Sequence, residues 1–293
     1  MPAEVVESYE QGVDTELAGL DALELGGTRG PGRLRRSWSA AWPKLAAVAL
    51  AIFLWQVVVW SGWRPRYALA GPDEVLPQLW QDLTDGTILD AARLTMRRAA
   101  VGFALATVIG VAVGSVVSRV RLLRAAFGSL ITGLQTMPSI AWFPLAILLF
   151  KLSEEAILFV VVLGAAPAIA NGLISGTDQV PPLLVRAGRV LGAKGWSLWR
   201  HVVLPASLPT FVGGLKQGWA FAWRSLMAGE LLVIIPGVQS IGVLLQTGRD
   251  LNDSVLLLET MIVILVIGIL VDSLFGTVER TLRRRRGLLE TAS

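Results

Sequence analysis

The sequence contains few of the side chains that perform covalent or metal chemistry. It has no cysteine, which excludes thiolate metal sites and disulfides, and its only histidine is His201. Ser139, Ser225 and Asp272 lie in apolar segments, but no histidine lies there to act as their base. The phosphate-binding pattern G-x-x-x-x-G-K-[ST] is absent as well. We therefore expect a chain that is not an enzyme, hydrolyses no ATP itself, and binds no cofactor or metal.

The chemistry that the sequence does suggest is recognition of an anion inside a membrane. Arg224 lies near the middle of a long apolar segment, where an arginine costs about 2.5–3.5 kcal/mol on insertion scales. Such a residue usually faces a partner or a water-filled path. A positive charge on a path offsets part of the cost of dehydrating a small anion. The alternative is a structural ion pair of Arg224 with Glu230 or Glu259.

Two prolines in an earlier apolar segment are further candidates for a path. Pro138 and Pro144 each remove a helical donor and free backbone carbonyls, which is tolerated where the break is buried or lines a cavity. Burial within the protein is the alternative to lining a path. The residues assigned to the path are Pro138, Ser139, Trp142, Arg224 and Glu230.

Residues 185–205 lie between two apolar segments and combine small, aromatic and cationic side chains. Their pattern predicts a helix, a break at Gly192 and a second short helix that ends before Pro205. Small residues would let another protein approach the backbone closely, while Trp196, Leu198 and Trp199 offer apolar anchors among surrounding cations. An ordinary loop on the positively charged side of a membrane is the alternative.

These residues need a membrane-spanning scaffold, and the composition predicts one. The 293-residue chain is 54% hydrophobic and only 16% charged, against about 25% charged in soluble domains, and its mean hydropathy is +0.62. A bilayer core needs roughly 20 apolar helical residues. The segments that qualify or nearly do are residues 45–60, 95–117, 125–150, 157–174, 205–235 and 255–275. We predict an all-α membrane protein with about six transmembrane helices.

The basic residues predict the orientation of these helices. With the N-terminus inside, most Lys and Arg residues flank the cytoplasmic ends, and the even number of helices leaves both termini in the cytoplasm. Clustering between apolar runs argues for a lipid bilayer and against nucleic acid as the partner of these charges. We predict a disordered tail over residues 1–43, first acidic and then basic, a membrane domain over 44–282 and a cytoplasmic tail over 283–293. An uncleaved first helix is favoured over a signal peptide cut after Ala68-Leu69-Ala70.

Residues 185–205 resemble the EAA loop of ABC importer permeases, in which a glutamate and two small residues precede a glycine and a later I-x-L-P. Ala187 and Gly188 match the small pair, Gly192 matches the glycine, and residues 202–205, VVLP, match the end. Arg186 departs from the pattern, because it stands where the family usually has glutamate. Residues 137–145 and 222–230 are similar to the third and fifth helices of the nitrate/sulfonate/taurine group, with the aliphatic sulfonate permeases as the best match.

The resemblance implies a type I ABC importer permease fold and a coupling loop that contacts an ATPase. The loop residues would be Arg186, Ala187, Gly188, Gly192, Ala193, Lys194, Trp196, Leu204 and Pro205. The implied partners are a second copy of the permease, a cytoplasmic ABC ATPase dimer that uses ATP and Mg²⁺, and an extracytoplasmic solute-binding protein. The implied location is a bacterial inner membrane. The implied substrate is a small anion, an aliphatic sulfonate by preference, with nitrate, taurine or bicarbonate as alternatives.

Two other classes of protein stay open at this point. An integral-membrane enzyme would need a cluster of nucleophile, base or metal-ligand side chains within the apolar segments. A secondary transporter or channel would often show paired halves with interrupted helices, and no internal repeat is visible.

Overall fold

The structure is a computed structural model that describes residues 33–285, and every described element is helical. Most of the two predicted tails, residues 1–32 of 1–43 and residues 286–293 of 283–293, lies outside the described residues, so the division into tails and a membrane domain stays a prediction. The chain divides between Trp63 and Arg64 into two compact units. The first contains helix α2, Arg33–Trp60, whose apolar part Trp42–Trp60 is long enough to cross a membrane. This part agrees with the first predicted span.

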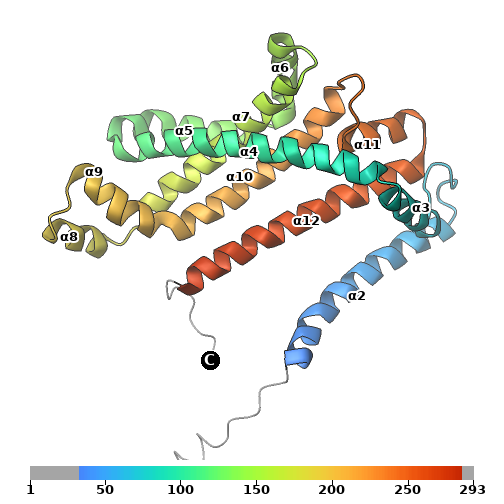
Figure 1. Ribbon diagram of the computed structural model, residues 1–293, viewed down its shortest axis with the longest axis horizontal. Coiled ribbons are helices and arrows are strands. Elements are labelled where there is room, and N and C mark those ends of the chain that lie inside the picture. Colours follow the sequence, from blue (N-terminus) through green and yellow to red (C-terminus); the bar gives the residue numbers. More distant parts are fainter. Residues whose placement is uncertain (1–32, 286–293) are drawn as a thin grey trace, which may run out of the picture. The chain divides into compact units, whose positions relative to one another are not determined.

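The second unit is built from long helices with shorter ones at their two ends. The long helices are α4 (Thr87–Arg119), α7 (Glu154–Asp178), α10 (Leu204–Leu232) and α12 (Ser254–Arg285). Figure 1 shows α8 (Pro182–Val190) and α9 (Gly195–Leu198) at one end, and α3 (Pro72–Thr84) and α11 (Ile241–Asp250) at the other. We call these the loop end and the far end.

The third predicted span is not a single straight helix. Helix α5, Arg121–Thr136, ends before Met137 and Pro138, and the chain continues through a 3-10 turn, Ser139–Trp142, into α6, Phe143–Phe150. The two halves are bent by 100°. Pro138 stands directly before the turn, where its fixed φ fits the extended backbone. Pro144 lies in the first turn of α6, where a missing N–H costs no helical hydrogen bond, so only Pro138 marks the break.

The remaining predicted spans form: α4, α7 and α12 extend beyond their apolar runs, and α10 ends three residues before the predicted limit. Among the described residues, four helices are long and apolar enough to cross a membrane, or up to five with the bent pair. Helix α10 is not among them, although it has 29 residues; its sequence includes Lys216, Arg224 and Glu230. With α10 the arrangement is consistent with the predicted six.

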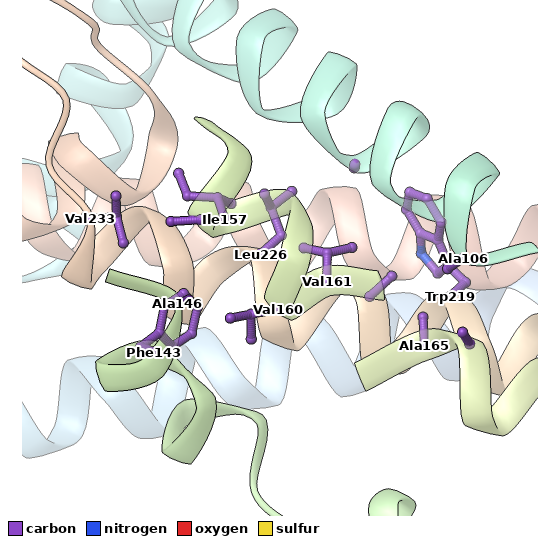
Figure 2. Packing of buried hydrophobic residues seen from close by; sticks show 14 of the residues in the cluster. Ala106, Phe143, Ala146, Ile157, Val160, Val161, Ala165, Trp219, Leu226 and Val233 are labelled. Atoms are coloured by element: carbon purple, nitrogen blue, oxygen red, sulfur yellow. The ribbon is translucent and has the colours of Figure 1, made fainter. Parts of the chain in front are cut away.

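Helix α7 is the centre of the second unit, with α4 and α10 packed against it. Figure 2 shows the side chains between these helices, including Val160, Val161, Leu226 and Trp219. Glycines let the backbones approach: a Cβ at Gly110 would lie 2.8 Å from the carbonyl oxygen of Ala166. The glycines of α4 therefore serve close packing of this helix against α7. We call α4, α7 and α10 the three-helix body.

Candidate functional site

A pocket of about 280 Å³ opens where the bent pair faces the three-helix body. The end of α5 and the following turn form one wall, Gly164 of α7 a second, and Phe221 and Arg224 of α10 a third. The residues contributed by the break are Leu134, Gln135, Thr136, Met137, Pro138, Ser139, Ile140 and Trp142. The structure therefore brings together Pro138, Ser139, Trp142 and Arg224, four of the five residues assigned to the path.

The lining of the pocket contains one cation, several uncharged polar groups and no carboxylate. The guanidinium of Arg224 lies 5.7 Å from the ring centre of Phe221 and forms no ion pair with the described residues. Its side chain is exposed in this chain. Gln135, Thr136 and Ser139 add amide and hydroxyl groups. One uncompensated positive charge among neutral hydrogen-bonding groups is suited to holding a small anion.

The lining is also close to a buried polar group. A Cβ at Gly164 would lie 2.5 Å from the hydroxyl of Ser225, so this hydroxyl lies close behind the lining at Gly164. The Ser225 hydroxyl is buried and has no hydrogen-bond partner in the described part of the chain. Ser225 follows Arg224 directly, so the two polar groups sit at the same level of α10.

Glu230 lies elsewhere, in a buried ionic network at the far end. Its carboxylate is fully buried and accepts hydrogen bonds from Nη1 of Arg98 at 3.0 Å, from the Thr95 hydroxyl at 3.0 Å and from the Gly242 amide at 3.1 Å. Arg98 also donates to Glu154 of α7 at 3.0 Å. Glu230 does not line the pocket in this conformation, and its partner is Arg98, so the alternative pairing of Arg224 with Glu230 is wrong.

Arg98 is a residue whose role the sequence did not reveal. The pattern places it near the start of an apolar run, where a cation is expected to reach water, yet its side chain is only 3% exposed. The available signal was a pair of opposite charges, Arg98 and Glu230, each within a predicted apolar segment. Their pairing depends on how α4 and α10 pack, which the sequence pattern does not give.

The coupling loop, residues 179–203 between α7 and α10, has the predicted first helix and break. Helix α8 ends at Val190, and Gly192 has a φ of +87°, a left-handed conformation that favours glycine. Gly188 is buried against the second half of the loop, since a Cβ there would lie 2.9 Å from side-chain atoms of Leu198 and Val202. The small residue at position 188 thus packs the loop itself. Arg186, Ala187 and Lys194 are exposed, and Ala193 is half-buried.

The second short helix does not end before Pro205, as the sequence predicts. Helix α9 continues through a π-helical turn, Trp199–Val203, directly into α10, so Leu204 and Pro205 form the first turn of that helix. Proline has no N–H and its ring collides with the carbonyl four residues back, and a π turn is one way to make room for it. The loop is therefore joined to α10 without a break.

The surface of the loop is apolar at its tips and cationic around them. Val190 is 88% exposed and Leu191 86% exposed, and Trp196 is also exposed. The cations are Arg186, Arg189, Lys194 and Arg200, and no acidic residue occurs between Asp178 and Glu230. Exposed apolar residues surrounded by positive charges favour binding to a partner surface that is both apolar and acidic.

An aromatic cluster connects this loop to α4. The rings of Trp196 and Trp199 are stacked with centroids 5.2 Å apart and planes 14° apart. The guanidinium of Arg119, the last residue of α4, lies 3.9 Å from the centre of the first ring and 4.0 Å from the centre of the second. We call these three residues the Arg119 clamp.

Comparison with known proteins agrees with this geometry. The family model described as the inner membrane component of binding-protein-dependent transport systems matches residues 106–284. A putative ABC transporter permease of Methanocaldococcus jannaschii is 30% identical over 233 residues, which cover 78% of this chain and 86% of that protein. A putative aliphatic sulfonates transport permease, SsuC of Bacillus subtilis, is 27% identical over 260 residues, covering 89% of this chain and 92% of that protein.

Other relatives carry different substrate names. The riboflavin permease RibX of Chloroflexus aurantiacus is 28% identical and covers 88% of this chain and 96% of its own length. The nitrate permease NrtB of Synechococcus elongatus is also 28% identical and covers 72% and 81%. Among solved structures, a chain of the inward-facing MetNI methionine ABC transporter has a TM-score of 0.58 at 19% identity, covering 70% of this chain and 98% of that chain. The last likeness concerns the fold alone.

Proposed function

We propose that this chain, which belongs to the family of binding-protein-dependent transport system inner membrane components, moves a small anionic solute across the membrane. As a member of that family it is a membrane-spanning permease subunit of an ABC importer, and ATP hydrolysis takes place in a separate subunit. The solute class, the path and the contacts with partners are the parts proposed here. The secondary transporter, the channel and the membrane enzyme gain no support from the relatives.

The observation that carries the proposed solute class is Arg224 in the pocket at the Pro138 break. It is the one charged side chain of the lining, and no carboxylate of the described residues neutralises it. A small anion that leaves water needs such a compensating charge. The attraction of a single arginine also stays weak enough for release, as transport requires. Relatives named for sulfonates and nitrate fit an anion, whereas the relative named for riboflavin does not point to one. An aliphatic sulfonate is the preferred candidate.

The coupling loop is the proposed contact with the cytoplasmic ABC ATPase. Its exposed Val190, Leu191 and Trp196 supply apolar anchors, and its cations select an acidic groove. Because Arg186 replaces the usual glutamate, we propose that the ATPase presents a carboxylate at the place where that glutamate would find a cation. Two such ATPase subunits, using ATP and Mg²⁺, would act on two copies of the permease. An extracytoplasmic solute-binding protein would deliver the solute, with both termini of this chain in the cytoplasm.

Replacement of Arg224 tests the proposed solute class. Uptake is measured in vesicles that contain the assembled complex, with labelled alkanesulfonate and nitrate as probes. Arg224→Lys should retain partial uptake, because the charge survives although the planar fork does not. Arg224→Gln should lower uptake about tenfold or more, as expected for one charge-assisted contact worth about 1.5–3 kcal/mol. Arg93→Gln, which removes an exposed cation of α4 outside the pocket, is the matched control.

The same preparations separate the proposed path from a structural role. Full uptake of anions by Arg224→Gln would refute the anion contact. Loss of assembled complex without a specific uptake defect would assign Arg224 to structure instead. If no ATPase accompanies the unaltered permease through purification, the importer itself would be in question, and a channel or secondary transporter would replace it.

A further inference from the structure

The coupling loop is tied to two helices of the three-helix body by the chain itself. It leaves α7 after Asp178 and enters α10 through the π turn. The third helix, α4, ends at Arg119 and continues into α5, so it has no covalent connection to the loop. The Arg119 clamp connects α4 to the loop without a covalent bond. The guanidinium of Arg119 lies against the ring of Trp196 in α9 and the ring of Trp199 in the π turn.

The geometry of the Arg119 clamp allows it to transmit movement between the coupling loop and α4. A guanidinium within about 6 Å of an aromatic ring centre is attracted by the ring face, and a flat guanidinium stacks better than an ammonium. Arg119 meets this condition at two rings at once. The rings are in turn stacked on each other, so a displacement of either is felt by the same side chain.

The three-helix body is packed tightly enough to move as one. A Cβ at Gly114 of α4 would lie 2.9 Å from the carbonyl oxygen of Ala170 in α7. A Cβ at Gly214 of α10 would lie 2.5 Å from the Cα of Gly172, also in α7. Helices in such close contact do not slide without strain. A push on the loop therefore reaches α7 and α10 directly and reaches the loop end of α4 through Arg119.

We propose that Arg119 is a positioning residue that makes α4 follow the coupling loop when the ATPase moves it. The proposal rests on the proposed function, because it presupposes that the loop contacts an ATPase. Without the clamp, the loop still binds the ATPase and still rotates with α7 and α10. The last turn of α4, which lies beyond the close contact at Gly114, then lags, and the α4–α5 connection that leads to the pocket wall loses its drive. ATP is then hydrolysed with less solute moved per ATP.

The test measures solute transported per ATP hydrolysed in reconstituted vesicles that contain the whole complex, with the alkanesulfonate or nitrate that the unaltered complex transports. Arg119→Gln should lower this ratio at least about two- to fivefold, the range for losing one cation–π contact of 0.5–1 kcal/mol, since it removes the cation from two rings. Arg119→Lys should recover part of the ratio, since the cation remains. Trp199→Leu should match Arg119→Gln, and the double variant should be no worse than either single one. Arg283→Gln removes a cation from α12, paired with Glu279 at 2.8 Å, and serves as the control.

Each outcome supports or overturns the proposal. A normal ratio in Arg119→Gln, or additive losses in the double variant, would overturn it. Reduced co-purification of the ATPase in Arg119→Gln would show that the residue belongs to the docking surface and would overturn it as well. Equal loss in Arg119→Lys and Arg119→Gln would refute the cation–π link. Failure of the proposed function is distinguishable, because then the unaltered chain would bring down no ATPase.

Discussion

Helix α4 carries an arginine at each end of the three-helix body, and the two arginines are held in opposite ways. At the far end, Arg98 is 3% exposed and bonds to carboxylates of α10 and α7 at 3.0 Å. At the loop end, Arg119 lies against two aromatic rings and forms no ion pair with the described residues. The buried network is costly to break because it leaves an unpaired buried charge, whereas the contact of Arg119 with two ring faces can change without burying one. The far end is thus suited to staying fixed and the loop end to transmitting movement.

The comparison assumes that the two ends face opposite sides of the membrane. Cysteine labelling tests this assumption and is the prediction with the largest expected effect. The chain has no cysteine, so the background is clean. Leu152→Cys, beside Glu154 at the far end, should react with a membrane-impermeant maleimide from outside. Leu191→Cys in the coupling loop should react only after the membrane is opened. Both positions are exposed, at 51% and 86%. The reverse pattern would overturn the orientation and with it the assignment of the loop to the ATPase.

Breaking the buried network should produce the largest loss of stability. Arg98→Gln leaves the fully buried carboxylate of Glu230 without its cation, and breaking a buried pair costs about 3–5 kcal/mol. We expect a large fall in the melting temperature of the detergent-solubilised protein and a low yield. Arg98→Gln combined with Glu230→Gln should be less destabilising than Arg98→Gln alone, because no fully buried carboxylate is then left without its cation; Glu154, which also loses Arg98, is 37% exposed. An additive loss in the double variant would show that the two residues do not act as a pair.

The contact between α7 and α10 lies between the two ends and should give an intermediate effect. Gly214→Ala places a methyl group against the backbone of Gly172, and such overpacking costs about 1–3 kcal/mol. The adjacent Gly213→Ala is a matched control, since a Cβ there meets no atom within 4 Å. Melting temperatures of the two variants should differ clearly. Equal values would mean that α7 and α10 are not held at this crossing, which would weaken the inference that the body moves as one.

The sequence predicted the elements of this comparison better than their contacts. The apolar runs gave the long helices, and Gly192 gave the break in the coupling loop, because these features depend on local pattern and on backbone conformation. Pro138, Ser139, Trp142 and Arg224 were assigned to one path and do line one pocket. Pro138 and Ser139 are neighbours at a proline break, and the local sequence was enough to identify these two.

What the sequence did not give depends on packing between distant segments. Glu230, part of the stretch that resembles the family's fifth helix, was assigned to the path, but Arg98 of another helix neutralises it. The 100° bend at Pro138 and the continuous helix through Pro205 each involve a proline, yet only the first breaks the helix. A π turn leads into the second without a break, and Val202 of this turn packs against Gly188. No local pattern distinguishes these cases.

The smallest expected effect on stability comes from Arg119→Gln, the same substitution as Arg98→Gln but at the loop end of α4. Arg119→Gln removes a cation from two ring faces, and contacts of this kind contribute about 0.5–1 kcal/mol at accessible sites. No buried charge is left behind, so the melting temperature should fall far less than in Arg98→Gln, although the chemical change is identical. The transport-to-ATP ratio should show the opposite order, with the Arg119 variant impaired in a complex that is still well folded. If Arg119→Gln destabilised the protein as much as Arg98→Gln, the clamp would be part of the static framework. The two ends of α4 would then not differ in kind, and the transmission of movement would have to run through α7 and α10 alone.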